Sequence, residues 1–303
     1  MNLRFSFATF ATALLTSGVV AAPEVVASIK PIHSMVTAVM AGIGEPTLLV
    51  RGAASPHTYA LKPSDAAALE SADLVFWTGH GMELFLSDAL DTLSTDAQIV
   101  ELAKSPGIRL LSVREGGAFE AHEEEAASKE EEGEADMHFW LDPENAKLMV
   151  THIAATLSAA DPQNAQAYNS NAQTEIAALD QLAAELTATL APVKDKPFVV
   201  FHDAYQYFEN RFGLTLAGSI TVSPETAPGA ARIDELKSKI AELGATCVFS
   251  EPNFQPTIIN AIIEGSAAEA GVLDPEGGAL AEGPDLYANL LRGLATSLVD
   301  CLG

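Results

Sequence analysis

The chain has 303 residues, 48% of them apolar, and a formal charge of −25 at neutral pH. A chain of this length can bury two compact cores, because one domain usually takes about 100–200 residues. The charge excludes a nucleic-acid function, since a phosphate backbone is bound through clustered lysine and arginine side chains, and it favours cations as partners.

The first 22 residues predict a cleaved secretory signal. Arg4 precedes the apolar stretch FSFATFATALLTSGVV, which leads into Ala21-Ala22-Pro23. This stretch is too short and too rich in alanine, threonine and serine to span a bilayer, for which about 20 strongly apolar residues are needed. No cysteine follows it for lipid attachment. We therefore expect a soluble mature protein in the periplasm.

Apolar runs then alternate with amphipathic stretches, which is the pattern of β/α units around a parallel sheet. The first half predicts an N-terminal α/β domain at 23–160. Its expected strands are 25–31, 46–52, 72–79 and 99–103, and its expected helices are 34–42, 64–71 and 82–93.

A glutamate-rich insertion interrupts this domain at 115–137, immediately before His138. Its very low apolar content predicts a disordered, solvated segment. Two interpretations remain open at this stage. The insertion is either a tolerated surface loop or a weak cation-collecting tether that holds His122 among carboxylates.

A connecting helix is predicted at 161–192, where Asp161 can cap and Pro162 suits the first helical position. Alanine, glutamine, glutamate and leucine dominate the segment. A long rigid helix between two domains argues against a wide hinge motion, whereas a Gly/Ser linker would favour one.

The remaining residues, 193–303, predict a C-terminal α/β domain. Its expected strands are 197–203, 214–220, 245–251 and 272–275, and its expected helices are 204–212, 231–243, 256–270 and 285–300. The chain has two cysteines, Cys247 and Cys301. In an exported protein this distant pair favours a disulfide, although two buried free thiols remain the alternative.

Three of the seven histidines lie where predicted elements end: His57, His138 and His202. Ligands of open parallel sheets bind beyond the carboxyl ends of the strands, so these positions make a site between the domains plausible. Neutral imidazoles suit zinc, copper, iron and nickel, and three of them with one oxygen donor form a tetrahedral zinc site. Spacing alone leaves ordinary structural histidines as an equal alternative.

The chain contains the motifs SPHTYALKPSD, MHFWLDPENA, FHDAYQYFENRFGL, SPETAPGAARIDELKSKI, FSEPNFQP and GVLDPEG. They occur in the order found in the metal-specific solute-binding proteins of ABC importers, and they most resemble the ZnuA-like zinc-uptake branch. The resemblance implies two (β/α) sandwich-like domains with parallel sheets, joined by one long rigid backbone helix. It also implies a Zn²⁺ ion in the interdomain cleft, a membrane permease as partner and a monomeric state.

The same resemblance implies the ligands His57, His138 and His202, with Asp274 or a water as the fourth donor, and a disulfide between Cys247 and Cys301. Pro56 stands where some relatives carry a further glutamate ligand, and the glutamate-rich insertion stands where zinc members often carry a histidine-rich loop. His202 occupies the position at which the manganese and iron branch has glutamate. An imidazole there shifts the preference toward zinc.

Two other classes of function also fit some of these features. A zinc hydrolase also presents three histidines and a water, but the chain has no HExxH motif, and Glu251 is the one candidate left open as a general base. An extracellular adhesin is disfavoured by the missing lipid-anchor cysteine and by the lack of repeats. We therefore expect a non-enzymatic zinc-binding transport protein. His33, His80 and His152 are expected to be structural.

Overall fold

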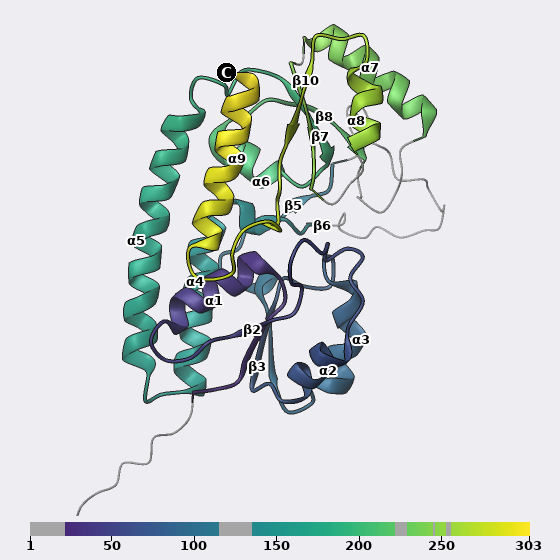
Figure 1. Cartoon of the computed structure of the whole chain (residues 1–303). Helices are drawn as coiled ribbons and strands as arrows, with labels where there is room; N and C mark the ends of the chain where they lie inside the picture. Colours follow the sequence, from purple (N-terminus) through teal and green to yellow (C-terminus); the bar gives the residue numbers. More distant parts are fainter. Residues whose placement is uncertain (1–21, 115–134, 222–228, 245, 253–255) are drawn as a thin grey trace, which may run out of the picture.

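The computed structural model describes residues 22–114, 135–221, 229–244, 246–252 and 256–303. Nearly all of the predicted signal, and residues 115–134 of the predicted insertion, lie outside this range. Two four-stranded parallel sheets stand one above the other in Figure 1, with long helices along one side. No helix among the described residues is long and apolar enough to cross a membrane.

The first sheet has the strand order β2-β1-β3-β4. Its strands are β1 (Val25–Ala27), β2 (Thr47–Leu48), β3 (Leu74–Trp77) and β4 (Gln98–Glu101), and helices α1 (Lys30–Met40), α2 (Pro63–Glu70) and α3 (Leu84–Leu93) connect them. The predicted strand 25–31 is too long. Helix α1 already begins at Lys30 and has Pro31 in its first turn, where the missing backbone N–H leaves no helical hydrogen bond unmade.

Two short strands that the sequence did not predict follow this sheet. Strands β5 (Leu111–Ser112) and β6 (Ala135–Asp136) pair antiparallel, so the predicted disorder of 115–137 is wrong for its last residues. The 3₁₀ turn η2 (Phe139–Leu141) and the helix α4 (Pro143–Ala160) come next. A second 3₁₀ turn, η1 (Leu102–Lys104), directly follows β4.

The predicted connecting helix is α5 (Ala165–Leu190), which lies beside α4 and is about 39 Å long at 1.5 Å per residue. It begins later than the prediction from Asp161 and Pro162. The backbone N–H of Asp161 still donates to Leu157 at the end of α4, and its carboxylate accepts hydrogen bonds from Asn164 and Tyr168, at 2.7 and 3.0 Å. Asp161 therefore forms the turn between the two helices.

The second sheet has the order β10-β9-β7-β8, again all parallel. Its strands are β7 (Phe198–His202), β8 (Leu216–Thr221), β9 (Cys247–Ser250) and β10 (Glu269–Val272), and its helices are α6 (Gln206–Phe212), α7 (Ala230–Leu243), α8 (Pro256–Ile263) and α9 (Leu286–Leu302). The predicted helix 256–270 ends early because Gly265 takes a left-handed conformation (φ +81°), which terminates helices. Strand β10 consequently begins three residues before the predicted strand 272–275 and overlaps it only at Val272.

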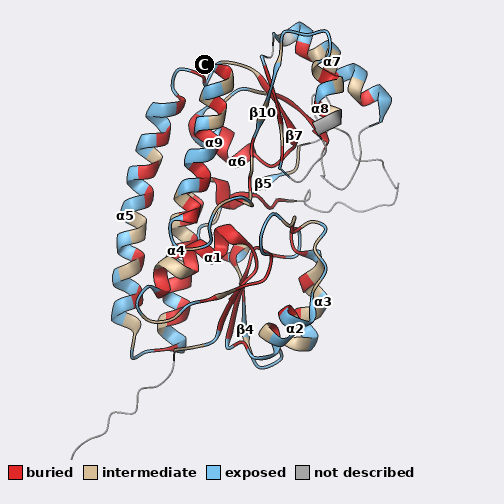
Figure 2. Ribbon diagram, viewed as in Figure 1, coloured by how far each residue is buried: buried red, intermediate tan, exposed pale blue. Residues whose placement is uncertain are grey.

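One hydrophobic core runs from the first sheet through α4, α5 and α9 to the second sheet. Figure 2 shows buried residues in both sheets and on the helices between them. Helix α9, at the end of the chain, packs against α5 and α1. Buried polar contacts also join the halves: Trp140 Nε1 donates to the carbonyl of Pro275 at 3.0 Å, and Tyr287 Oη donates to the carbonyl of Trp140 at 2.6 Å. The division into domains at 23–160 and 193–303 remains a proposal.

The predicted disulfide is confirmed. Cys247 at the start of β9 is bonded to Cys301 in the last turn of α9, across 54 residues of sequence, with a Cα–Cα distance of 6.1 Å. It ties the C-terminal helix to the second sheet.

Candidate metal centre

The three histidines predicted as ligands lie together at the carboxyl ends of strands. His57 stands in the loop between β2 and α2, His138 follows β6 directly before η2, and His202 is the last residue of β7. His57 and His202 converge because the carboxyl edges of the two parallel sheets face the same region, and His138 joins them from the antiparallel β5–β6 pair. Each comes from a different loop or strand end, so the fold brings them together from 145 residues of sequence.

One ring nitrogen from each of the three side chains lies within 4.8 Å of the others. His138 Nε2 and His202 Nε2 are 3.3 Å apart. Two nitrogens bound to one tetrahedral zinc at about 2.0–2.1 Å would be about 3.3–3.4 Å apart. This pair of nitrogens therefore already has the separation that a tetrahedral zinc ion requires.

His57 completes the triangle. Its ring centroid lies 5.5 Å from that of His138 and 5.7 Å from that of His202. Burial, together with the neighbouring rings of His138 and His202, lowers the pKa of His57 to about 2. Burial also holds the pKa of His138 well below its ordinary value. Both imidazoles are therefore neutral near pH 7, which is the form that binds a metal.

His202 differs from the other two because a carboxylate faces it. Its Nδ1 is 2.5 Å from Glu251 Oε1. Burial alone would lower the pKa of His202, but the charge and hydrogen bond of Glu251 outweigh burial and raise it. Asp136 approaches His138 in the same way, with Oδ1 2.8 Å from Nδ1. Burial raises the pKa of Asp136 to about 7.

These pKa shifts predict how zinc affinity depends on pH. Below its raised pKa the His202 ring is charged, so zinc must displace a proton from it, and the partly protonated Asp136 loses a proton when a cation arrives nearby. We expect one to two protons released per zinc and an affinity that falls about ten- to a hundredfold per pH unit from 7 to 5. Calorimetry in buffers of different ionisation enthalpy measures this number. Release of no proton, or of three, would contradict it.

Asp274 follows β10 and lies outside the cluster of three histidines that could hold a metal among the described residues. Its Oδ1 accepts hydrogen bonds from the backbone N–H groups of Glu276 and Gly277, at 3.1 and 2.9 Å. These bonds shape the loop after β10. The assignment of Asp274 or a water as the fourth zinc donor stays a prediction.

The loop after β10 also touches the loop that carries His57. A Cβ atom on Gly278 would come within 3.0 Å of Ala53 Cα, so glycine permits this close approach. The buried Lys30 is hydrogen-bonded to the same loop. Its Nζ donates to the carbonyls of Gly278 and Leu280 at 2.7 and 3.0 Å. Segments from both halves of the chain therefore meet beside the loop that carries His57.

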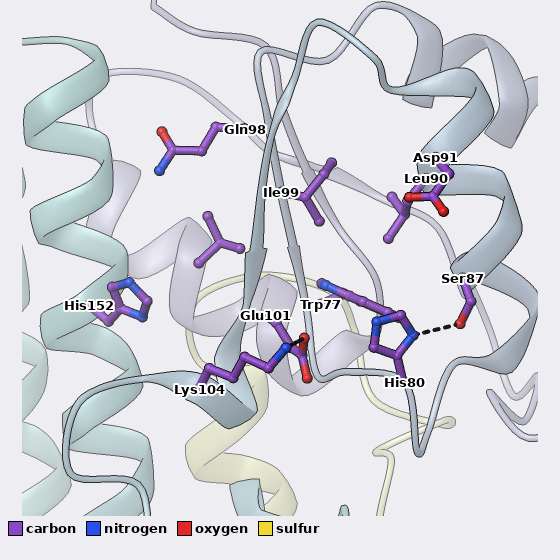
Figure 3. Close-up of a pocket in the computed structure, with 11 residues that line it drawn as sticks. Trp77, His80, Ser87, Leu90, Asp91, Gln98, Ile99, Glu101, Lys104 and His152 are labelled. Carbon is purple, nitrogen blue, oxygen red and sulfur yellow. Dashed lines mark hydrogen bonds and ion pairs between the residues drawn. The ribbon is translucent and has the colours of Figure 1, made fainter.

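The remaining histidines lie elsewhere or outside the described residues. His80 and His152 line a hollow of about 390 Å³ around the edge strand β4 (Figure 3). Each has its own partner: His80 Nδ1 is 3.0 Å from Ser87 Oγ, and His152 Nδ1 is 2.8 Å from Ser105 Oγ. His33 Nε2 bonds to a backbone carbonyl. His122 lies in the segment that the structure does not describe.

Sequence reasoning missed one residue of the site and misjudged another. Asp136 lies in the segment that the sequence predicts to be disordered. Its position two residues before His138 was nevertheless a sign that its carboxylate could contact that histidine. Glu251 was considered only as a general base, yet it follows β9 at the same sheet edge as His202. Both carboxylates contact imidazoles of the three-histidine cluster.

Comparisons with known proteins agree with this geometry. The family described as "Zinc-uptake complex component A periplasmic" matches residues 25–301. The "High-affinity zinc uptake system protein ZnuA" of Brucella abortus is 52% identical over 304 residues, covering 92% of this chain and 91% of that protein. Two solved structures share the fold with a TM-score of 0.78, covering 93% of this chain and 100% of theirs. They are a ZnuA at 26% identity and a mutant of the laminin-binding adhesin of Streptococcus agalactiae at 27%.

Proposed function

This chain belongs to the family of periplasmic zinc-uptake complex components, and we propose from that premise that it captures Zn²⁺ in the periplasm and delivers it to the permease of an ABC importer. The observation that carries the proposal is the convergence of three imidazole nitrogens within 4.8 Å. Zinc is the transported cargo, so the protein must bind it tightly and then release it.

The protonation state of the histidines explains how the site can capture zinc. Two of the imidazoles are held neutral by burial, so their lone pairs are ready for a cation without prior loss of a proton. We infer that His57, His138 and His202 are the donors, with Asp274 or a water as the fourth. The acidic surface attracts cations toward the site over a distance of about a Debye length. We also infer that the protein acts as a monomer.

Metal selectivity tests the proposal. Three imidazoles favour zinc, whereas manganese prefers carboxylate and water oxygens. We expect one tight zinc per chain and an affinity for manganese at least about a hundredfold lower. Competition calorimetry with both metals measures this ratio. Equal affinities would assign the protein to manganese or iron uptake instead.

The zinc hydrolase alternative lacks an available general base, because its one candidate is already engaged. A base must be within reach of a zinc-bound water, but Glu251 is engaged at 2.5 Å by His202 Nδ1, on the side of that ring away from His138. We therefore propose a binding role without catalysis. Incubation of the zinc-loaded protein with ester, peptide and phosphate substrates tests this point, and turnover of any of them would contradict it.

A further inference from the structure

A buried site made of three neutral imidazoles has no charge of its own to balance Zn²⁺. His138 and His202 are only 7% and 3% exposed, so little water can solvate the two positive charges of a bound ion. Transfer of an uncompensated charge from water into such surroundings is strongly unfavourable. Tight binding therefore requires negative charge close to the ligands.

Two buried carboxylates stand at the required place. Asp136 Oδ1 contacts both the backbone N–H and Nδ1 of His138, at 3.0 and 2.8 Å, and Glu251 Oε1 contacts Nδ1 of His202 at 2.5 Å. Each carboxylate is 6% exposed. Because each ionised carboxylate can only accept, the proton of each neutral ring is placed on Nδ1. The lone pair is then on Nε2.

The ring orientation agrees with this assignment. With Nδ1 directed at the carboxylates, the Nε2 atoms of His138 and His202 face each other at 3.3 Å. The two carboxylates thus lie on the outer sides of the pair of rings. The Nε2 atoms on the inner sides face the position that a metal ion would occupy. The same carboxylates that fix the protons also fix where the lone pairs point.

The carboxylates are themselves held in place, by different means. Asp136 ends strand β6, and its backbone carbonyl accepts a 2.6 Å hydrogen bond from Tyr207 Oη, which also accepts from the backbone N–H of Leu111 on β5. Glu251 directly follows β9, which pairs with β7, the strand that ends in His202. One support joins the β5–β6 pair to helix α6 through Tyr207, and the other crosses between neighbouring strands.

We propose that Asp136 and Glu251 are positioning residues of the zinc site, which hold the protons of His138 and His202 on Nδ1 and supply the two negative charges that balance Zn²⁺. This inference rests on the proposed zinc-binding function. With a water as the fourth donor, the zinc-bound site is then neutral in total: two positive charges on the ion, three neutral rings and one negative charge on each carboxylate. Both carboxylates then contribute to the zinc affinity without contacting the ion.

Paired substitutions separate charge from hydrogen bonding. Asp136→Asn and Glu251→Gln retain an oxygen acceptor but lose the charge, whereas Asp136→Ala and Glu251→Ala lose both. We expect about a tenfold loss of zinc affinity for each amide variant and about a hundredfold loss for each alanine variant. Asp161→Asn is the matched control, because it neutralises a buried carboxylate in the α4–α5 turn and should leave the affinity unchanged.

Nuclear magnetic resonance of the ¹⁵N-histidine-labelled, zinc-loaded wild-type protein gives a test that does not depend on how the variants fold. We expect His138 and His202 to carry the proton on Nδ1 and the metal on Nε2. The opposite tautomer, or variants within twofold of a tightly binding wild type, would overturn the inference and leave the zinc-binding function intact. Weak zinc binding by the wild type itself would instead refute the proposed function.

Discussion

Replacement of His202 by alanine should lower the affinity for zinc by more than about a hundredfold, beyond the loss typical of residues that only support a ligand. The substitution removes one of three converging nitrogens and leaves the buried carboxylate of Glu251 without its imidazole partner. An unpaired buried carboxylate is itself unfavourable, so some loss of thermal stability should accompany the loss of binding. Calorimetric titration with zinc measures both the affinity and the stoichiometry.

His152→Ala is the matched control for this experiment. It likewise removes a histidine with a side-chain hydrogen bond, here to Ser105, but His152 is only partly buried and lies on helix α4, outside the cluster of three histidines. We expect its zinc affinity to equal that of the wild type. Equal losses in the two variants would mean that histidine removal acts through general damage to the fold. Tight binding by His202→Ala would place the site in another part of the chain.

Reduction of the Cys247–Cys301 disulfide should lower the thermal stability more than the substitutions at the three-histidine cluster do. The bond closes 54 residues, and in the chain-entropy model a loop of this size contributes about 4 kcal/mol. We expect a decrease in the melting temperature of roughly 5–15 °C. Differential scanning calorimetry of the zinc-free protein with and without reductant measures it.

The zinc site should survive that reduction below the melting temperature. His57, His138 and His202 lie at the strand ends, whereas Cys247 begins β9 and Cys301 lies near the end of α9. Zinc affinity at 25 °C should therefore change less than about threefold. The double variant Cys247→Ser, Cys301→Ser checks that reductant acts through this bond alone. An unchanged melting temperature after complete reduction would contradict the stabilising role.

The sequence predicted those parts of the fold that local pattern determines. The apolar run of β7 ends at His202, and that of β3 ends at Trp77, because strands buried on both faces appear as short continuous apolar segments. The motifs around His57 and His138 predicted that these residues lie in one site with His202, and the structure brings one ring nitrogen of each together. The meeting of these residues from both halves depends on two parallel sheets facing each other, which the repeated β/α pattern indicates.

Local pattern failed where distant segments determine the structure. Strand β6 has two residues, and its pairing with β5 could not be recognised beside a long run of glutamates. Asp136 was consequently missed. The start of α5 was misplaced because Asp161 can cap a helix and can also form a turn, and its contacts with Asn164 and Tyr168 decide between these roles. The contact of Lys30 with the loop near Gly278 joins residues 248 positions apart.

We expect the helices α5 and α9 to make the molecule unfold as a single cooperative unit. Buried side chains continue without a break from the strands near the N-terminus, through Leu182 and Leu186 on α5 and Leu294 on α9, to the strands near the C-terminus. Separation of the halves would expose this shared apolar surface to water, so neither half is expected to persist when expressed alone. A break in the chain at an exposed loop would then leave two fragments that remain associated and melt together.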